Sequence, residues 1–170
     1  MGMKSIQAII DTPFAQLAVQ TCRQSQEFVI GIDFLSIGSR QPFLSSRFTE
    51  LLAVDIERYL KNPAYRFEMA FLAHGTEFQQ AVWQIMQNIE AGKTRTYGDV
   101  ARELSSSPRA VGNACRCNPI PLLIPCHRIV AKKGIGGFAG HRSGDIFDIK
   151  SWLLRHEAGK FDQKTEIKDE

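Results

Sequence analysis

The sequence predicts an α/β protein in two parts, a small antiparallel sheet with one helix followed by a mostly helical half. Three observations support this fold class. Apolar residues alternate in the first third of the chain, their period becomes helical near residue 46, and capped helical segments follow residue 75. We expect an N-terminal domain at 1–74, a C-terminal domain at 75–160 and a disordered polar tail at 161–170.

The N-terminal part reads as a three-stranded meander. Strands are predicted at 6–10, 17–22 and 28–34, with the first turn at Asp11-Thr12-Pro13. From Ser46 the apolar residues follow a helical period, up to Asn62-Pro63, which ends the helix. Its apolar face consists of Phe48, Leu51, Leu52, Ile56 and Tyr59. A further extended segment is expected at 67–72, where apolar residues alternate in part.

The second half contains four predicted helices. Thr76 and Gln79 form a capping box for the first, which Gly92 ends. Thr96 caps a short helix to Leu104. Ser107-Pro108 then starts a third, running to Cys117, because serine is a good N-cap and proline suits the first helical position. This spacing is typical of a helix-turn-helix, although unrelated helical proteins share it. A glycine-rich loop at 132–140 precedes the last helix, from Asp145 to Gly159.

Positive charge is concentrated in the second half. The chain has a net charge of +3, yet residues 1–76 carry seven basic and seven acidic side chains. Residues 91–142 carry nine lysines and arginines against two acids, Asp99 and Glu103. Such an excess favours a polyanionic partner, with a merely solvated surface as the alternative.

No targeting or membrane segment is apparent in the sequence. The first ten residues are too short and too broken to form a signal peptide, and no run approaches the roughly 18 apolar residues that span a bilayer. We therefore expect a cytoplasmic protein without membrane contact. In that compartment the four cysteines are expected to be free thiols.

The segment Ile124-Pro125-Cys126-His127-Arg128 sets a cysteine before a histidine and an arginine, framed by prolines. Neighbouring cationic or basic groups convert a thiol to the nucleophilic thiolate, so the pattern predicts a reactive cysteine. A buried cysteine that only packs is the alternative. The prolines make a regular helix through Cys126 improbable on steric grounds.

The third helix of the second half is rich in small residues behind Arg109, namely Ala110, Val111, Gly112 and Ala114. Small residues permit close approach of the backbone, either to a neighbouring helix or to a groove of DNA. In the second case the long planar cation of Arg109 suits the space left by an extruded base.

These motifs, taken together and in order, resemble the O6-alkylguanine-DNA alkyltransferases, also called methylated-DNA–protein-cysteine methyltransferases. The resemblance covers nearly all of 75–159. It rests on Gly75-Thr76, Phe78-Gln79, Val82-Trp83, Thr96-Tyr97-Gly98, Arg109-Ala110-Val111-Gly112, Arg116, Asn118-Pro119, Ile124-Pro125-Cys126-His127-Arg128, Trp152-Leu153-Leu154 and His156-Glu157.

The resemblance implies DNA repair by direct, irreversible and stoichiometric transfer of an alkyl group, typically methyl, from O6-alkylguanine to Cys126. O4-alkylthymine is a second candidate base. It also implies that His127 acts through a water, that Glu157 polarises His127 and that Asn118 orients the turn. Tyr97 is implied to donate to N3 of the departing guanine. No cofactor is expected.

The resemblance further implies a ribonuclease-H-like N-terminal domain and a winged-helix-like C-terminal domain that binds double-stranded DNA in the minor groove as a monomer. Base flipping would be assisted by Arg109. The expected DNA-binding residues are Tyr97, Arg109, Ala110, Gly112, Asn113 and Arg116, and the expected pocket residues are Ile129, Phe138 and Ala139.

The chain departs from the family pattern around the expected pocket. The turn before Arg109 and the loop at 134–140 are shorter than usual, and 141–147 resembles an insertion. Ala139 supplies no hydroxyl for the O6 atom. Only Cys22 and His74 match the structural zinc ligands of some members, so no metal is expected.

Three other readings remain open at this point. One is a zinc module built from Cys115, Cys117, Cys126 and His127, although Cys-x-Cys spacing is uncommon for structural zinc. Another is a non-catalytic alkyltransferase-like damage sensor, which would lack the acceptor cysteine. The third is a cysteine hydrolase, which would regenerate its thiol.

Overall fold

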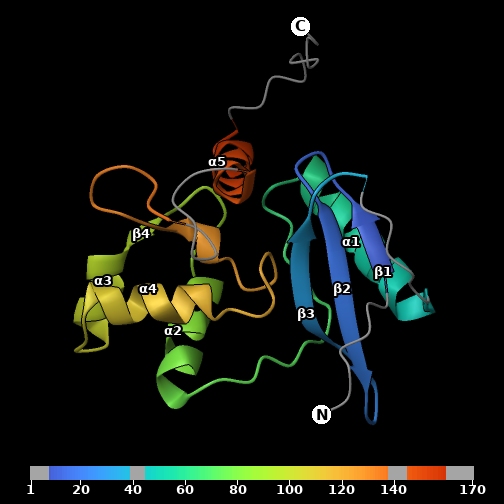
Figure 1. Cartoon of the computed structure of the whole chain (residues 1–170), viewed down its shortest axis with the longest axis horizontal. Coiled ribbons are helices and arrows are strands. Elements are labelled where there is room, and N and C mark those ends of the chain that lie inside the picture. Colours follow the sequence, from blue (N-terminus) through green and yellow to red (C-terminus); the bar gives the residue numbers. More distant parts are fainter. Residues whose placement is uncertain (1–7, 39–44, 138–144, 160–170) are drawn as a thin grey trace, which may run out of the picture.

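The computed structural model describes residues 8–38, 45–137 and 145–159 (Figure 1). Its N-terminal part is an antiparallel sheet of β1 (Ala8–Asp11), β2 (Gln16–Arg23) and β3 (Glu27–Leu35), in the order β1-β2-β3. The predicted meander is confirmed, with residues 6–7 outside the described part. A register shift between Gln20 and Thr21 marks a bulge in the β2-β3 pair.

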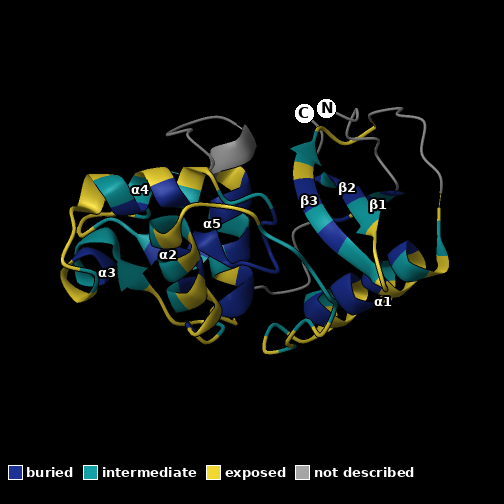
Figure 2. Cartoon of the chain, turned by 90° about the horizontal axis from the view of Figure 1, so that it is seen from below, coloured by how far each residue is buried: buried dark blue, intermediate teal, exposed yellow. Residues whose placement is uncertain are grey.

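Helix α1 (Arg47–Lys61) lies across one face of the sheet (Figures 1 and 2). It begins at the expected N-cap, because Ser46 and Thr49 bond each other's backbone in a capping box. It ends at Asn62, since Pro63 cannot continue it. The buried face of α1 carries Leu52, Ile56 and Tyr59, three of the five residues predicted for it. Leu51, by contrast, is exposed.

The extended segment expected at 67–72 is reduced to a single bridge. Phe71 pairs in parallel with Val29, whose amide donates to the Ala70 carbonyl at 3.0 Å and whose carbonyl accepts from Leu72 at 2.9 Å. The side chains from 65 to 69 do alternate between half-buried and exposed. The chain leaves the sheet edge after Leu72 to reach the next helix, so no longer ladder forms.

The C-terminal half consists of short helices and two very short strands. Its elements are α2 (Glu77–Gln87), β4 (Arg95–Thr96), α3 (Tyr97–Glu103), α4 (Pro108–Arg116), the 3₁₀ turn η1 (Cys126–Arg128), β5 (Ile129–Val130) and α5 (Asp145–Glu157). Strands β4 and β5 pair in parallel. Strands of two residues are too short to leave a period in the sequence, so this pair was not predicted.

The helix-turn-helix spacing is confirmed in α3 and α4. Ser107 caps α4 by accepting from the Ala110 amide at 3.2 Å, and Pro108 occupies its first turn. The turn between the helices places Ser105 at a positive φ of 50°. The indole of Trp83 donates to the Ala114 carbonyl at 2.9 Å, which fixes α4 against α2.

The two halves meet at α5, which lies on the side of the helical half that faces the sheet (Figures 1 and 2). Trp152 of α5 contacts Phe14, with ring centroids 4.7 Å apart. Strand β3 also contacts the helical half, because the Ile32 amide donates to the Pro119 carbonyl at 2.9 Å. One hydrophobic cluster runs through both halves.

Candidate active site

Cys126 opens the 3₁₀ turn η1 and is buried, with 6% of its surface exposed. The side chain of Asn118 holds both ends of the 120–124 segment that leads into this turn: its amide donates to the Ile124 carbonyl at 2.8 Å, and its oxygen accepts from the Ile120 amide at 3.0 Å. The orienting role of Asn118 stays a prediction, and these bonds place its side chain against the segment that precedes the thiol. The backbone through Cys126 is not a regular α-helix, as the flanking prolines indicated.

The carboxylate of Glu157 is surrounded by five hydrogen-bond donors. Its Oε1 accepts from Tyr59 at 2.9 Å and from Arg128 Nη2 at 2.8 Å, and it lies 2.8 Å from His127 Nε2. Its Oε2 accepts from Arg128 Nε at 2.9 Å and from the Gly92 amide at 3.3 Å. Burial alone would raise the pKa of Glu157, but His127 and Arg128 outweigh it and hold that pKa well below the usual range. Glu157 is therefore a carboxylate at neutral pH.

The tautomer of His127 follows from this partner. A carboxylate oxygen only accepts, so Nε2 must carry the proton and Nδ1 must be the basic nitrogen. His127 is buried, and its Nδ1 has no hydrogen-bond partner among the described residues. Burial lowers the pKa of His127 despite the neighbouring carboxylate, so the ring is neutral and able to accept a proton.

Burial raises the pKa of the Cys126 thiol, and two side chains oppose that rise. The amide of Asn118 and the positive charge of Lys150 both favour the thiolate. Lys150 is fully buried in α5, and its Nζ donates to the carbonyls of Ile129 at 2.6 Å and Gly137 at 2.9 Å. Burial lowers the pKa of Lys150 to about 8, which leaves most of it charged at neutral pH.

Tyr97, at the start of α3, lies beside Lys150 and shares its acceptor, the Gly137 carbonyl. Its hydroxyl donates to the Gly137 carbonyl at 3.2 Å, and its ring lies 5.7 Å from Lys150 Nζ. Burial, together with the nearby thiols of Cys115 and Cys126, raises the pKa of Tyr97. The hydroxyl is thus protonated at neutral pH and can donate. Gly136, at a φ of +73°, lets the backbone pass the ring, because a Cβ there would lie 3.0 Å from it.

The expected DNA-binding residues of α4 share one outward face. Arg109, Asn113 and Arg116 are exposed, at the spacing of successive helical turns, whereas Val111 and Ala114 on the opposite side are buried (Figure 2). Ala110 and Gly112 are half-buried next to this face. The face combines two arginines with small side chains, as a surface that approaches a polyanion closely requires.

The remaining predicted positions have different outcomes. Ile129 is fully buried in β5 and contributes its carbonyl to Lys150. Phe138 and Ala139 lie outside the described residues, as does the tail at 161–170. Among the residues that the structure describes, no three His, Cys, Asp or Glu side chains are grouped so that they could hold a metal. Cys115, Cys117, Cys126 and His127 are all described, so the zinc-module reading has no site.

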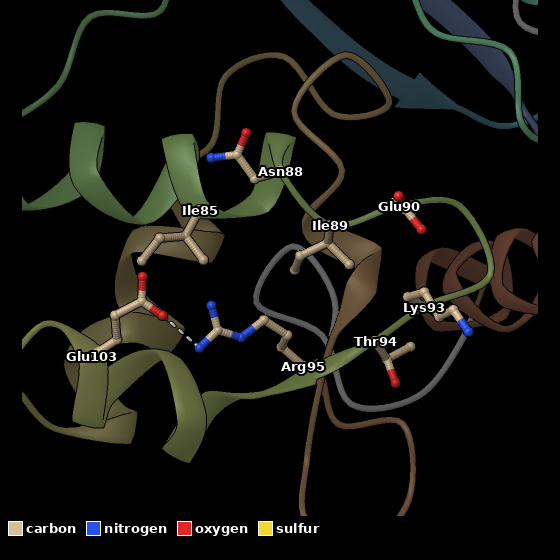
Figure 3. Close-up of a pocket in the computed structure, with 8 residues that line it drawn as sticks. All are labelled: Ile85, Asn88, Ile89, Glu90, Lys93, Thr94, Arg95 and Glu103. Carbon is tan, nitrogen blue, oxygen red and sulfur yellow. Dashed lines mark ion pairs between the residues drawn. The ribbon is translucent and has the colours of Figure 1, made fainter.

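A cavity of about 300 Å³ lies elsewhere, between α2, β4 and α3 (Figure 3). It is lined by Ile85, Asn88, Ile89, Glu90, Lys93, Thr94, Arg95 and Glu103, and Arg95 pairs with Glu103 at 2.7 Å. It borders the Glu157 cluster at Ile89, whose carbonyl accepts from Arg128 Nη1 at 2.5 Å. The reactive thiol does not line this cavity.

Two residues of the site were missed in the sequence. Tyr59 was assigned only to an apolar helix face, and Lys150 was not singled out. Lys150 precedes Glu157 by seven residues, or about two turns, so a search for polar residues on the inner face of the last helix would have found it. Nothing in the local sequence pairs Tyr59 with Glu157, which lies 98 positions away.

Comparison with known proteins assigns a class to this arrangement. Residues 77–159 match the family described as "6-O-methylguanine DNA methyltransferase, DNA binding domain". The C-terminal half is thus a DNA-binding domain of the alkyltransferase class. No described helix is long and apolar enough to cross a membrane.

Individual relatives match a stretch as long as this domain or a longer one. A methylated-DNA–protein-cysteine methyltransferase of Methanocaldococcus jannaschii is 57% identical over 81 residues, which are 48% of this chain and about half (46%) of the relative. The Archaeoglobus fulgidus protein of the same name is 38% identical over 120 residues, covering 70% of this chain and 81% of the relative.

The fold has a counterpart among solved structures. Mycobacterium tuberculosis OGT in complex with DNA superimposes with a TM-score of 0.69 at 27% identity, covering 89% of this chain and 92% of that one. The sheet, the helices and their order are therefore those of a known fold. The chain belongs to the methylated-DNA–protein-cysteine methyltransferase family.

Proposed function

We propose that this chain repairs DNA by transferring an alkyl group from O6 of guanine directly to the sulfur of Cys126. Family membership supplies the activity, and one observation carries the assignment of residues. The Glu157 carboxylate holds the proton of His127 on Nε2 and leaves a basic Nδ1 without a protein partner, on the residue next to a buried cysteine. A thiol requires such a base to become nucleophilic at neutral pH.

In the proposed reaction the sulfur attacks the alkyl carbon in line, so a C–S bond forms as the C–O bond breaks. The thiol proton passes to His127 through one bridging water, and the departing guanine takes up a proton at N3 from Tyr97. His127 then releases its proton to solvent and Tyr97 regains one from solvent, so that overall the proton of the thiol replaces the alkyl group on the base. Lys150 and Asn118 support the thiolate, and the raised pKa of Tyr97 keeps its hydroxyl protonated, so that it can donate a hydrogen bond to N3 as negative charge develops there.

The partner in this proposal is double-stranded DNA that contains an alkylated base. The α4 face with Arg109, Asn113 and Arg116 would lie in the minor groove, and Arg109 would occupy the gap left by the flipped nucleotide. Base flipping costs a few kcal/mol, which the inserted guanidinium and the pocket offset. The relative solved in complex with DNA supports DNA as the partner. Little sequence readout is expected, because the minor groove offers a degenerate pattern.

Finer points of the fold belong to the same proposal. We infer a ribonuclease-H-like N-terminal domain at 1–74 and a winged-helix-like C-terminal domain at 75–160, in which β4 and β5 accompany the helix-turn-helix. We also infer that the protein acts as a monomer inside the cell, where its DNA is. O4-alkylthymine remains a second candidate base.

The proposal is tested with duplex DNA that carries one O6-methylguanine. After incubation, intact mass and peptide mapping should find one added methyl group per molecule, on Cys126. Cys126→Ser should show no transfer, while Cys117→Ser, which alters an exposed thiol, should react normally. A methyl group on Cys22, Cys115 or Cys117, or repair by Cys126→Ser, would contradict the assignment. DNA binding without any transfer would instead identify a damage sensor. Repeated turnover of esters or amides, with the thiol regenerated each time, would identify a hydrolase.

A further inference from the structure

Glu157 receives one of its five donors from the other half of the molecule. The Tyr59 hydroxyl, on α1, lies 2.9 Å from Glu157 Oε1, the same oxygen that His127 Nε2 contacts at 2.8 Å. Tyr59 is buried, with 2% of its surface exposed. Tyr59 therefore touches no base or alkyl group, but it shares an acceptor atom with the residue proposed as the base.

The position of the Tyr59 hydroxyl is fixed from several sides. Its ring contacts Phe67 at a centroid distance of 5.5 Å and the His156 ring at 5.2 Å, edge to face. The His156 ring nitrogen Nε2 lies 3.0 Å from the Tyr59 carbonyl. His156 thus contacts the backbone of Tyr59, while the Tyr59 hydroxyl donates to the next residue, Glu157. This reciprocal contact sets the end of α5 relative to α1.

The charges around Glu157 show what the hydroxyl does there. The carboxylate faces Arg128 and His127 from η1, the Gly92 amide from the turn after α2, and Tyr59 from α1. His127 is also within reach of the charges of Arg128 and Lys150. Arg128 neutralises the carboxylate, so the hydroxyl is not needed for charge balance. It draws electron density on Oε1 away from His127 and restricts rotation of the carboxylate.

We infer that Tyr59 is a positioning residue for alkyl transfer, through which the N-terminal half orients Glu157 and sets the basicity of His127. The inference rests on the proposed function, and it gives the N-terminal half a task in the reaction itself. A further contact between the halves, from the Ile32 amide to the carbonyl of Pro119, holds the loop that follows Asn118. Both sides of the Cys126 turn are therefore supported by elements of the N-terminal half.

The inference is tested with Tyr59→Phe in the full chain, which removes only the hydroxyl and keeps the packed ring. Without that donor, Oε1 attracts the His127 proton more strongly, so the pKa of His127 should rise. The acid limb of the rate profile should then move to higher pH, because His127 must be neutral to accept the thiol proton. The rate at neutral pH should fall about tenfold, as is typical when one charge-assisted hydrogen bond is lost. It should fall equally with free O6-methylguanine base and with duplex, while affinity for undamaged duplex stays unchanged.

Tyr65→Phe is the matched control. Tyr65 also donates to a carboxylate, Asp55 Oδ1 at 2.7 Å, in the same half but away from the Glu157 cluster. It should lower the melting temperature without moving the pH profile. Tyr59→3-fluorotyrosine, which keeps the ring and makes the hydroxyl a stronger donor, should move the acid limb to lower pH and so tests the inference even if Tyr59→Phe fails to fold.

An unshifted pH profile in both Tyr59 variants would overturn the inference and leave Tyr59 a packing residue. Failure of the proposed function is recognised separately, because the unaltered protein would then not transfer methyl to Cys126 at all.

Discussion

At the scale of single residues, the chemistry depends on how burial is compensated. Cys126 and His127 are both deeply buried, which disfavours a thiolate and an imidazolium alike. The site meets this cost with oriented groups: Lys150 and Asn118 for the sulfur, Glu157 for the imidazole. Among the described residues Lys150 has no carboxylate partner, and its charge acts on the nearby thiols of Cys126 and Cys115.

Replacing Lys150 should make Cys126 harder to ionise. We expect Lys150→Met to raise the pKa of the Cys126 thiol, because the variant lacks the cation that lowers it. The rate of Cys126 alkylation by iodoacetamide, measured by peptide mapping from pH 6 to 10, should rise at higher pH than in the unaltered protein. The difference should shrink above about pH 8, where Lys150 loses its own charge. Lys133→Met, at an exposed position, is the control; coincident profiles for both variants would show that Lys150 only packs.

Arg109 should matter for DNA but not for chemistry. Arg109→Ala should slow repair in duplex DNA much more than transfer from the free base, since a free base needs no flipping. Single-turnover rates with both substrates measure the difference, with Arg66→Ala, an exposed arginine of the other half, as the control. Equal losses for Arg109→Ala on both substrates would contradict its insertion into the gap left by the flipped nucleotide.

Tyr97→Phe, by contrast, should slow both reactions, because it removes the proposed donor to N3. The same single-turnover rates, with duplex and with free base, measure this loss.

At the scale of elements, capping determines whether the short helices form. Helix α4 has nine residues, too few to be stable alone, and its first turn depends on the Ser107 hydroxyl and on Pro108. The same helix carries the expected DNA-binding face. Its cap is therefore coupled to DNA binding, although Ser107 has no proposed role in the chemistry at the sulfur.

Loss of that cap should weaken DNA binding. Ser107→Ala should destabilise the fold by about 1 kcal/mol, the usual cost of removing a serine N-cap. Denaturant unfolding measures this loss, and titration of undamaged duplex should show weaker binding, while transfer from the free base should change little. Ser106→Ala, at the adjacent exposed serine, should affect neither. If free-base transfer falls as much as duplex repair, the cap supports the reaction turn rather than the DNA-binding face.

At the scale of the whole molecule, the buried cluster couples stability to pH. Glu157 has a lowered pKa when folded, so its contribution is present above its unfolded pKa of about 4.5 and is lost as the pH falls below that value. His127 also has a lowered pKa when folded. The unfolded chain therefore takes up a proton near pH 6.5 that the folded chain resists, and stability again falls with falling pH.

The two groups should produce acid sensitivity in two steps. Urea unfolding between pH 7.5 and 3.5 should show stability decreasing first below about pH 6.5 and then more steeply below about pH 4.5. His127→Gln should lack the first step and keep the second, whereas His74→Gln, at an exposed histidine, should keep both. Stability that stays constant down to pH 5 in the unaltered protein would show that His127 is protonated in the fold.

The reaction should also consume and destabilise the protein. A thioether at Cys126 has no good leaving group, so repaired base plotted against protein should reach a plateau at one per molecule. The added methyl occupies a buried turn, where overpacking typically costs about 1–3 kcal/mol. At roughly 2–4 °C per kcal/mol, the alkylated protein should melt several degrees lower in a thermal scan. Continued turnover without added reductant would identify an ordinary enzyme instead.

Local signals in the sequence determined much of this protein. Alternation set the strands, helical period and capping residues set the helices, and Cys126 with His127 was recognisable because both lie in one short motif. Glu157, Asn118 and Tyr97 came from the resemblance to a family, and the structure groups them with the thiol. Tertiary structure alone decided the partners that complete the site. Tyr59 is 98 positions from Glu157 and Lys150 is 21 from Ile129, and each meets its acceptor only after the chain has packed. A hydrogen bond between distant segments leaves no period or cap in the sequence, so its existence follows from packing and not from local preference.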